Sequence, residues 1–436
     1  KFLQDIPNYI DYAIEYTNEY AEYDLVPSKY MLQVNSEAID ELVGKNTNVF
    51  IEGFEKKLDE AAFLSDEERA NFKAKNKELV EQIVNPAFAK LKQQLSQWQE
   101  TFDEWEGFAE YAEGEDYYNY LIETYAGVSM DAEELFDYMY DKLDDCEERF
   151  SELLEDDEIY EGYMNSEYGF EKRTPSEILD ALRVYTKENF APIADPGYQV
   201  EELPNALRSD GVLAYYLTPQ EDHDDVNQIC LNPDALGTDL GVLYETLAHE
   251  GYPGHLYQHT FEQLDSYDPI RSLIYVGGYT EGWGLYSELY AYDFLDMNKT
   301  KANALKALSS LNYAICASLD LSVHGMGWNE AQCVSYLASF GITDTTQIHK
   351  LYLQLLEEPG NYLKYYLGYL EICKLKESAL ALSSNWSLYD FHNWFLTTGP
   401  APFSILTEHL EDLEISPKLL KRMSQDFHLL SVQPFH

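Results

Sequence analysis

The chain has few basic residues, few cysteines and no long apolar run. Its 436 residues include only 29 Lys and Arg against 79 Asp and Glu, which gives a formal net charge of −50. A surface this negative repels phosphate backbones and anionic lipids, so the sequence argues against nucleic acid as a partner. A membrane-spanning helix needs about eighteen or more consecutive apolar residues, and no such run is present, so we expect no transmembrane segment.

Several motifs that would define an enzyme class are also missing. There is no G-x-S-x-G elbow for a nucleophilic serine, and neither G-x-x-x-x-G-K-[ST] nor G-x-G-x-x-G for a nucleotide. The five cysteines have no C-x-x-C spacing, so they predict neither a metal knuckle nor a disulfide framework. Chemistry based on a nucleophilic serine or on a nucleotide is therefore not expected.

Helical patterns fill most of the chain. In residues 1 to about 190, amphipathic stretches predict helices at 42–63, 67–105, 117–125 and 131–154, with Pro86 as a kink in the second. The pattern then changes to period two, which predicts short strands at 198–203, 212–217 and 227–231. Helical patterning continues from there to the C-terminus. The sequence therefore predicts a mainly α protein with one small β-sheet.

The stretch from Ala248 to His255, AHEGYPGH, carries two histidines that enclose a glutamate at the end of an apolar helical run. Zinc peptidases of the HExxH type place their ligands in such a helix, with the two imidazoles four residues apart on one face. His249 and His255 are six apart and would diverge by roughly 120° on a regular helix. Pro253 would clash with the carbonyl of His249, so we expect a bulge or kink at Pro253-Gly254 that turns both imidazoles toward one metal ion.

The stretch from Tyr279 to Glu288, YTEGWGLYSE, offers a third ligand. A hydrolytic zinc site has about three protein ligands and one open position for water. Glu281 and Glu288 are seven residues apart and share a helical face, but they are separated by roughly 10 Å along the axis. We therefore expect one of them to bind the metal and the other to hydrogen-bond a histidine ligand.

His259 is a rival ligand, because it stands four residues after His255 and would share its face on a helix that resumes beyond the Pro-Gly break. That pair lacks a base, since Leu256 occupies the position where HExxH has its glutamate, whereas His249 is followed by Glu250. We therefore expect His259 to lie in a second layer around the site or simply to be exposed.

The two motifs, HE-x-x-PGH and EGW-x-LY-x-E, resemble those of the bacterial domain-of-unknown-function family 885 (DUF885), whose members are often described as lipoproteins. Their spacing is also similar to that of helical zinc carboxypeptidases and oligopeptidases of the thermostable-carboxypeptidase, thimet-oligopeptidase and angiotensin-converting-enzyme groups. The resemblance implies Zn²⁺ held by His249, His255 and Glu281. It also implies Glu250 as the general base and Glu288 as the carboxylate that orients a histidine.

Pattern and resemblance together predict a two-lobed, helical, zincin-like metallopeptidase with the small β-sheet directly before the metal-binding helix. We expect an N-terminal helical lobe at 1–196 and a zinc-binding catalytic lobe at 197–436, both within one continuous catalytic domain.

Two further segments match the same family more weakly. The stretch from Pro359 to Gly368 is similar to its PG-x4-Y-x-x-G segment, which implies that Tyr365 donates a hydrogen bond to the oxyanion formed during hydrolysis. Asp320 and His324 match D-x3-H-x2-GW, and their i, i+4 spacing would let them hydrogen-bond on one helical face. Two roles stay open for this pair. His324 could contact substrate and the oxyanion with Asp320 behind it, or the two could form a buried structural pair.

These expectations describe a zinc-dependent peptidase for short peptides, acting as a carboxypeptidase or an oligopeptidase. An arginine that the resemblance leads us to expect just before Asp320 is absent, so Arg271, Lys364 or Lys374 would have to hold a substrate carboxylate. A family rich in lipoproteins implies export, with a leader that has been removed and an extracellular or cell-surface location. Two alternatives stay open: an exported helical peptide-binding protein without turnover, and a metal-dependent hydrolase of a non-peptide amide or ester.

Overall fold

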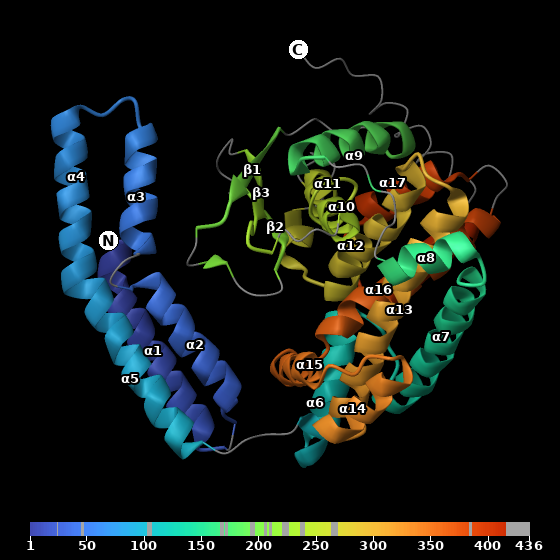
Figure 1. Cartoon of the computed structure of the whole chain (residues 1–436), viewed down its shortest axis with the longest axis horizontal. Coiled ribbons are helices and arrows are strands. Elements are labelled where there is room, and N and C mark those ends of the chain that lie inside the picture. The colour runs from blue at the N-terminus through green and yellow to red at the C-terminus, as the bar shows by residue number, and fades with distance from the viewer. Residues whose placement is uncertain are drawn as a thin grey trace. The chain divides into compact units, whose positions relative to one another are not determined.

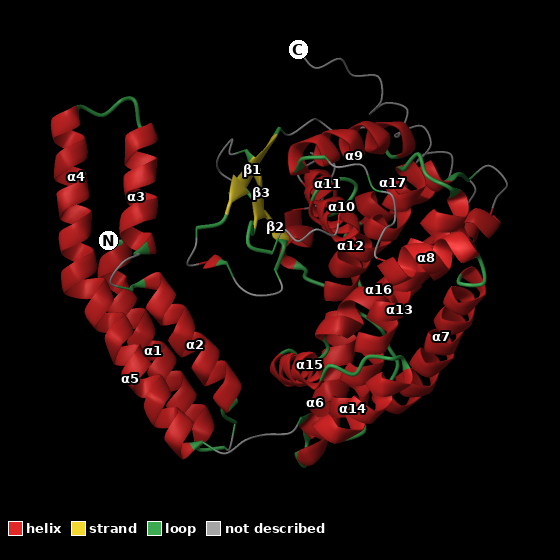
Figure 2. Ribbon diagram, viewed as in Figure 1, coloured by secondary structure: helices red, strands yellow, loops and turns green. Residues whose placement is uncertain are grey.

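The computed structural model describes residues 1–23, 25–44, 48–102, 107–165, 170, 173–191, 197–204, 207–208, 212–219, 226–235, 240–262, 269–382 and 386–415. These residues are mainly helical and include one small sheet, as the sequence predicts (Figure 2). Within these ranges, no helix combines the length and the apolar character that crossing a bilayer requires.

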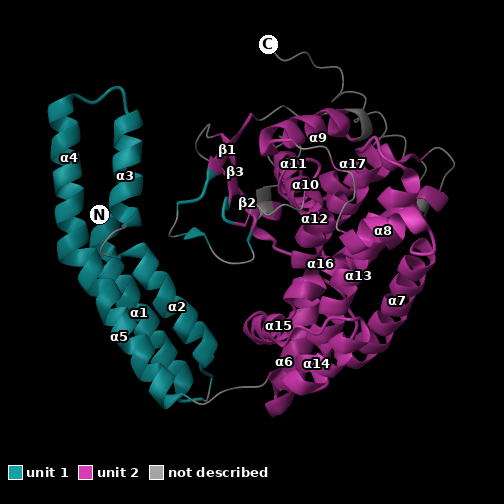
Figure 3. Ribbon diagram, viewed as in Figure 1, with its two compact units in different colours: residues 1–105, 202–212, 232–234 teal, residues 106–201, 213–231, 235–436 magenta. Residues whose placement is uncertain are grey.

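The chain forms two compact units (Figure 3). The first consists of Lys1–Trp105, Glu202–Val212 and Asn232–Asp234, and the second of Glu106–Glu201, Leu213–Leu231 and Ala235–His436. The first continuous segment of the first unit runs to Trp105 and its last helix ends at Thr101, whereas the division into lobes at 1–196 and 197–436 stays a prediction. Helices between residues 114 and 189 pack against helices that follow the sheet, and helical periodicity contains no signal for such long-range contacts.

The helices of the first unit are α1 (Phe2–Ala21), α2 (Lys29–Leu42), α3 (Val49–Glu60), α4 (Asp66–Leu79) and α5 (Asn85–Thr101) (Figure 1). A π-helical turn, Val80–Val84, joins α4 to α5 without a break in helical backbone angles. This run corresponds to the predicted helix at 67–105. Pro86 lies in the first turn of α5, directly after the π-helical turn, where its missing amide hydrogen is tolerated better than inside a regular helix.

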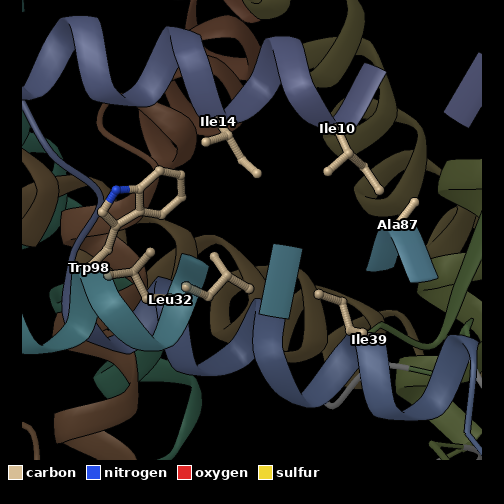
Figure 4. Close-up of a cluster of buried hydrophobic side chains, with 7 residues drawn as sticks. Ile10, Ile14, Leu32, Ile39, Ala87 and Trp98 are labelled. Carbon is tan, nitrogen blue, oxygen red and sulfur yellow. The ribbon is translucent and has the colours of Figure 1, made fainter. Parts of the chain in front are cut away.

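Buried apolar side chains hold α1, α2 and α5 together (Figure 4). Ile10 and Ile14 lie four residues apart on α1, and Leu32 and Ile39 lie seven apart on α2, so each pair shares one helical face. Trp98 contributes the large side chain from α5. Burial of these faces stabilises the first unit, since the hydrophobic effect scales with the apolar area removed from water.

The second unit contains most of the helices. They are α6 (Gly114–Leu121), α7 (Ala132–Leu153), α8 (Asp157–Asn165), α9 (Pro175–Asn189), α10 (Leu240–Glu250), α11 (His255–Glu262), α12 (Gly277–Ala291), α13 (Lys299–His324), α14 (Glu330–Ser339), α15 (Thr345–Glu357), α16 (Asn361–Leu382), α17 (Leu388–Thr398) and α18 (Phe403–Ile415). The long helix α13 packs against α7 and α16, and α12 packs against α10 and α16. These contacts bring together segments that are far apart in the sequence.

The three predicted strands are present as β1 (Tyr198–Glu202), β2 (Ala214–Leu217) and β3 (Asn227–Leu231). Their order is β1-β3-β2, so β2 is an edge strand. It runs antiparallel to β3, with Tyr216 opposite Ile229. The sheet directly precedes α10, and β2 contacts that helix.

Glycines allow α12 and α16 to touch backbone to backbone. A Cβ atom at Gly282 would lie 2.4 Å from the carbonyl carbon of Gly368, and a Cβ atom at Gly368 would lie 2.1 Å from the carbonyl oxygen of Gly278. Real Cβ atoms essentially never come so close to other heavy atoms, so a larger residue at these positions would push the helices apart. This contact fixes α12 relative to α16.

Replacing Gly282 with alanine should therefore destabilise the second unit by about 1–3 kcal/mol or more, because backbone atoms cannot move aside as a side chain can. Urea unfolding followed by circular dichroism would measure the change. Gly53→Ala is the matched control, because Gly53 lies in α3 and a methyl group added there would have no atom within 4 Å. It should be neutral or stabilising by up to about 1 kcal/mol. Equal stability of Gly282→Ala and the parent would disprove the backbone contact.

Candidate metal centre

The predicted break in the histidine helix is a complete interruption. Helix α10 ends at Glu250 and α11 begins at His255. Between them, the amide of Gly254 donates to the carbonyl of Ala248 at 3.0 Å, and the indole N–H of Trp283 donates to the carbonyl of Pro253 at 2.9 Å. A Cβ atom at Gly254 would lie 1.8 Å from the carbonyl oxygen of His249, so this tight return requires glycine.

The interruption brings the three predicted ligands together. Ligand atoms of His249, His255 and Glu281 all lie within 4.8 Å of one another. The Nε2 atoms of both imidazoles are 3.4 Å from the same carboxylate oxygen, Oε2 of Glu281. The rival His259 is not in this group, and its Nδ1 instead lies 3.1 Å from Glu262.

A second layer of side chains holds the imidazoles from behind. The Nδ1–H of His249 donates to Glu288 at 2.6 Å, and the hydroxyl of Tyr313 donates to the same carboxylate oxygen at 3.4 Å. The Nδ1–H of His255 donates to the side-chain carbonyl of Gln258 at 3.4 Å. Partners on Nδ1 fix the tautomer and leave Nε2 as the donor atom for a metal. Glu281 thus lies beside both Nε2 atoms and Glu288 lies behind His249, while the binding of a metal by Glu281 stays a prediction.

Gly284 is a residue of the centre that sequence reasoning missed. A Cβ atom there would come within 2.3 Å of the His249 imidazole. The glycine therefore lets the backbone of α12 lie directly against this ring. The EGWG sequence contained the signal, because a small residue three positions after a ligand marks the face of a helix that another group approaches closely.

Burial and hydrogen bonding act in opposite directions on the charges of this centre. Burial alone would lower the pKa of His249, but hydrogen bonds to Glu281 and Glu288 outweigh it and raise that pKa well above its usual range. Burial likewise opposes ionisation of Glu281, yet the two imidazoles hold its pKa well below its usual range. The surroundings therefore favour positive charge between the imidazoles and the Glu281 carboxylate, where a divalent cation would bind.

Glu250 and Tyr365 lie beside this group. The Oε2 atom of Glu250 accepts a 2.8 Å hydrogen bond from the backbone amide of Tyr216, on the edge strand β2. The ring of Tyr365 is 5.9 Å from the His249 ring, and its phenol hydrogen-bonds Glu281. Burial and the neighbouring carboxylates raise the pKa of Tyr365 far above its usual range, so the phenol keeps its proton and remains a hydrogen-bond donor.

Asp320 and His324 belong to a different polar cluster. In the described part of the chain, His324 donates from Nε2 to the carbonyl of Leu355 at 2.8 Å and accepts at Nδ1 from the amide of Phe108 at 3.4 Å. Asp320 accepts from the Tyr118 hydroxyl and, through both oxygens at 3.0 Å, from the amide of Gly360. None of these bonds joins Asp320 to His324 or reaches the three ligands. The contacts therefore give the pair a buried, structural character and do not support His324 as a group that contacts the oxyanion.

The burial of His324 predicts a pH dependence of stability. Burial lowers its pKa to about 4, against about 6.5 in an unfolded chain. Between these values the unfolded state binds more protons, so the stability that the neutral imidazole contributes is present above pH 6.5 and is lost as the pH falls toward 4. The free energy of unfolding of the parent, relative to that of His324→Gln, should therefore fall by on the order of 3 kcal/mol as the pH falls from 6.5 to 4.

Urea unfolding of both proteins at pH 7, 5.5 and 4.5 would test this. Burial raises the pKa of Asp320 to about 7, which gives an opposite trend, but Asp320 is present in both proteins and its effect cancels. A stability difference that does not change with pH would contradict the prediction.

Comparison with known proteins gives the family and the fold. Among solved structures, a "putative lipoprotein" from Colwellia psychrerythraea is similar with a TM-score of 0.81 and 21% identity, over 94% of this chain and 74% of that one. A "putative lipoprotein of unknown function" from Shewanella oneidensis has a TM-score of 0.60 and 18% identity, over 95% of this chain and 77% of that one. A search of curated proteins finds no match. The model of a family described as bacterial protein of unknown function matches residues 1–410, so the chain belongs to DUF885.

Proposed function

We propose that the chain is a zinc-dependent, zincin-like peptidase that hydrolyses short peptides. The observation that carries the proposal is the convergence of His249, His255 and Glu281, with ligand atoms within 4.8 Å, next to the carboxylate of Glu250. Two imidazoles and one carboxylate with a neighbouring glutamate form the donor set and base of known zinc hydrolases.

The residues fit a zinc ion on chemical grounds. Nitrogen and carboxylate oxygen are ligands that Zn²⁺ prefers, and three of them leave one position open. Glu288 accepts a hydrogen bond from Nδ1 of His249, and Gln258 accepts one from Nδ1 of His255. Both Nε2 atoms are therefore left to face the metal position. When bound, zinc supplies a Lewis acid that polarises a carbonyl and lowers the pKa of a water molecule.

Glu250 is proposed as the general base. Its carboxylate takes the proton from the attacking water and returns it to the leaving amine. The Tyr216 amide holds one of its oxygens at 2.8 Å, which fixes the direction of the other oxygen for proton transfer. Strand β2 therefore orients the base, which explains why the sheet directly precedes α10.

Tyr365 is proposed to stabilise the oxyanion of the tetrahedral intermediate. Its phenol stays protonated and lies beside Glu281 and His249. A donor that is preorganised in a buried site stabilises developing negative charge more than a donor in water does.

The edge strand favours a peptide over other amides and esters. Because the Tyr216 amide bonds Glu250, it points away from β3, and the alternation of an antiparallel ladder points the backbone groups of Ala214 the same way. Amide and carbonyl groups that point outward along this edge can pair with an extended peptide backbone. A non-peptide ester would make fewer of these hydrogen bonds.

The family and the two lipoproteins of similar fold support an extracellular or cell-surface location. The net charge of −50 disfavours nucleic acid, and we propose a short peptide as the partner.

Zinc binding is the first test. Protein purified without chelators or a metal-affinity tag should contain about one zinc per chain by plasma mass spectrometry. His249→Ala should lose the metal, because it removes a proposed ligand together with the hydrogen bond that His249 donates to Glu288. His259→Ala is the control and should retain zinc, since His259 pairs with Glu262 outside the ligand group. A parent that binds no zinc when it is offered would remove the hydrolase proposal.

Replacement of the base separates binding from turnover. Glu250→Gln should retain zinc but lose peptide hydrolysis by at least a hundredfold, because an amide cannot accept the proton. Mass spectrometry of a digested peptide library would measure this. Full activity of the variant would exclude Glu250 as base. A zinc-loaded parent that binds peptides and releases no products would instead favour a binding protein without turnover.

A further inference from the structure

Lys364 approaches the carboxylates of the metal centre. Its ammonium lies 3.9 Å from Oε1 of Glu281, while the other oxygen of that carboxylate faces the two imidazoles. Among the described residues, no second lysine or arginine forms an ion pair with Glu250, Glu281 or Glu288. The chain carries 79 acidic residues against 29 basic ones, so few cations are available to bind an anionic group at this centre.

The hydrogen-bond donors of Lys364 are not used by the part of the chain that the structure describes. A distance of 3.9 Å exceeds the 2.7–3.2 Å of an N–H···O hydrogen bond, so the contact with Glu281 is an ion pair alone. The side chain is only 20% exposed, which limits its access to water. An ammonium has three N–H donors, so an incoming acceptor can be bound without breaking an existing bond.

The position of Lys364 is fixed by its neighbours. A Cβ atom at Gly277 would lie 3.2 Å from both Cβ and Cδ of Lys364, so the start of α12 packs against the lysine stem. The ammonium lies 5.4 Å from the ring centroid of Tyr365, within the range of a cation–π interaction. These contacts hold the ammonium beside the proposed oxyanion donor.

The two other cations that could hold a substrate carboxylate are engaged elsewhere. Arg271 donates to the carbonyl of Pro400 at 3.2 Å. Lys374 is bonded to Glu371 at 2.5 Å and lies over the ring of Tyr138 at 4.6 Å. Neither contact involves a residue of the metal centre. The structure therefore favours Lys364 over Arg271 and Lys374 as the group that binds a substrate carboxylate, a choice that the sequence did not make.

We propose that Lys364 binds a substrate carboxylate one residue beyond the bond that is cleaved. This inference rests on the proposed peptidase function and names its substrate class. An extended peptide advances about 3.3–3.6 Å per residue. The ammonium lies 3.9 Å from one oxygen of Glu281, whose other oxygen faces both imidazoles, so a carboxylate bound by Lys364 stands within about one residue of a carbonyl held at that group. The carboxylate is that of the C-terminus or of an acidic side chain.

Paired peptide libraries test the proposal. The zinc-loaded parent is offered tetrapeptides with a free or an amidated C-terminus, and amidated tetrapeptides with Glu or Gln at the last position. A carboxylate should raise kcat/KM by roughly 10- to 100-fold, mainly through KM, as expected for a hydrogen bond between charged groups. Preference for the free acid identifies the C-terminus as the source, and preference for Glu over Gln identifies a side chain.

Lys364→Met should lower kcat/KM for the carboxylate peptides much more than for the amidated, Gln-containing peptides, so that the ratio between the two classes falls to about one. Lys364→Arg should retain part of the preference because it keeps the charge. Lys374→Met, on the same helix, is the matched control and should retain all of it.

A binding measurement separates this inference from the proposed function. Calorimetry with Glu250→Gln should show tighter binding of acid than of amide peptides, and Glu250→Gln/Lys364→Met should bind both alike. If the parent cleaves acids and amides equally, the peptidase stands and the inference fails. If Lys364→Met loses zinc or weakens both peptide classes equally, Lys364 only supports Glu281 and the inference also fails. If the zinc-loaded parent cleaves no peptide, the proposed function fails, and the calorimetry still decides whether Lys364 selects carboxylates.

Discussion

The close approach of α12 to its neighbours sets the distances among the side chains of the candidate metal centre. This helix supplies Glu281 and Glu288, and Gly284 allows its backbone to lie against the His249 ring. Gly282 allows the same helix to touch the backbone of α16, which supplies Tyr365. A methyl group at either glycine would lie within 2.5 Å of atoms of His249 or Gly368, so it would move α12 away from the groups that the candidate centre brings together. Any change that moves α12 relative to α16 would therefore also change the geometry of the candidate site.

Buried charge is the second requirement of this arrangement. The side chains of His249 and Glu288 are only 8% and 7% exposed, and a charge removed from water is strongly unfavourable unless it is paired. Here each charged group has partners, since Glu288 receives hydrogen bonds from His249 and Tyr313, and Glu281 faces both imidazoles. Such a network adds little net stability compared with an apolar core, but it favours one arrangement of α10 and α12. We infer that the network positions His249 and Glu281 more than it stabilises the fold.

Sequence alone predicted the elements whose signals are local. The period of two predicted all three strands, and the Pro-Gly pair predicted the interruption that brings His249 and His255 together. The proline acted together with the glycine that follows it, since proline alone does not end every helix here: α1 continues through Pro7. The grouping of His249, His255 and Glu281 was predicted from spacing and from a family resemblance, and their binding of a metal stays a prediction.

Residues that act across large separations in the sequence were not predicted. Tyr216 reaches Glu250 from another element through its backbone amide, which every residue except proline possesses, so no side-chain pattern marks it. Tyr313 is one of 37 tyrosines, and nothing near it in the sequence distinguishes it from the others. The boundary at Trp105 depends on the packing of α7 against α13, and amphipathic periodicity shows that a helix is buried but not against which partner.

The two weaker motifs make sense as a single structural unit. Both oxygens of Asp320 accept from the amide of Gly360, whose φ of 77° favours glycine, and α16 begins at the next residue. The carboxylate thus anchors the start of the helix that carries Lys364 and Tyr365. The D-x3-H segment does not reach His249, His255 or Glu281, yet through Asp320 it holds the start of the helix that carries Lys364 and Tyr365. Asp320 therefore affects where Lys364 and Tyr365 stand although its own hydrogen bonds go to Tyr118 and Gly360.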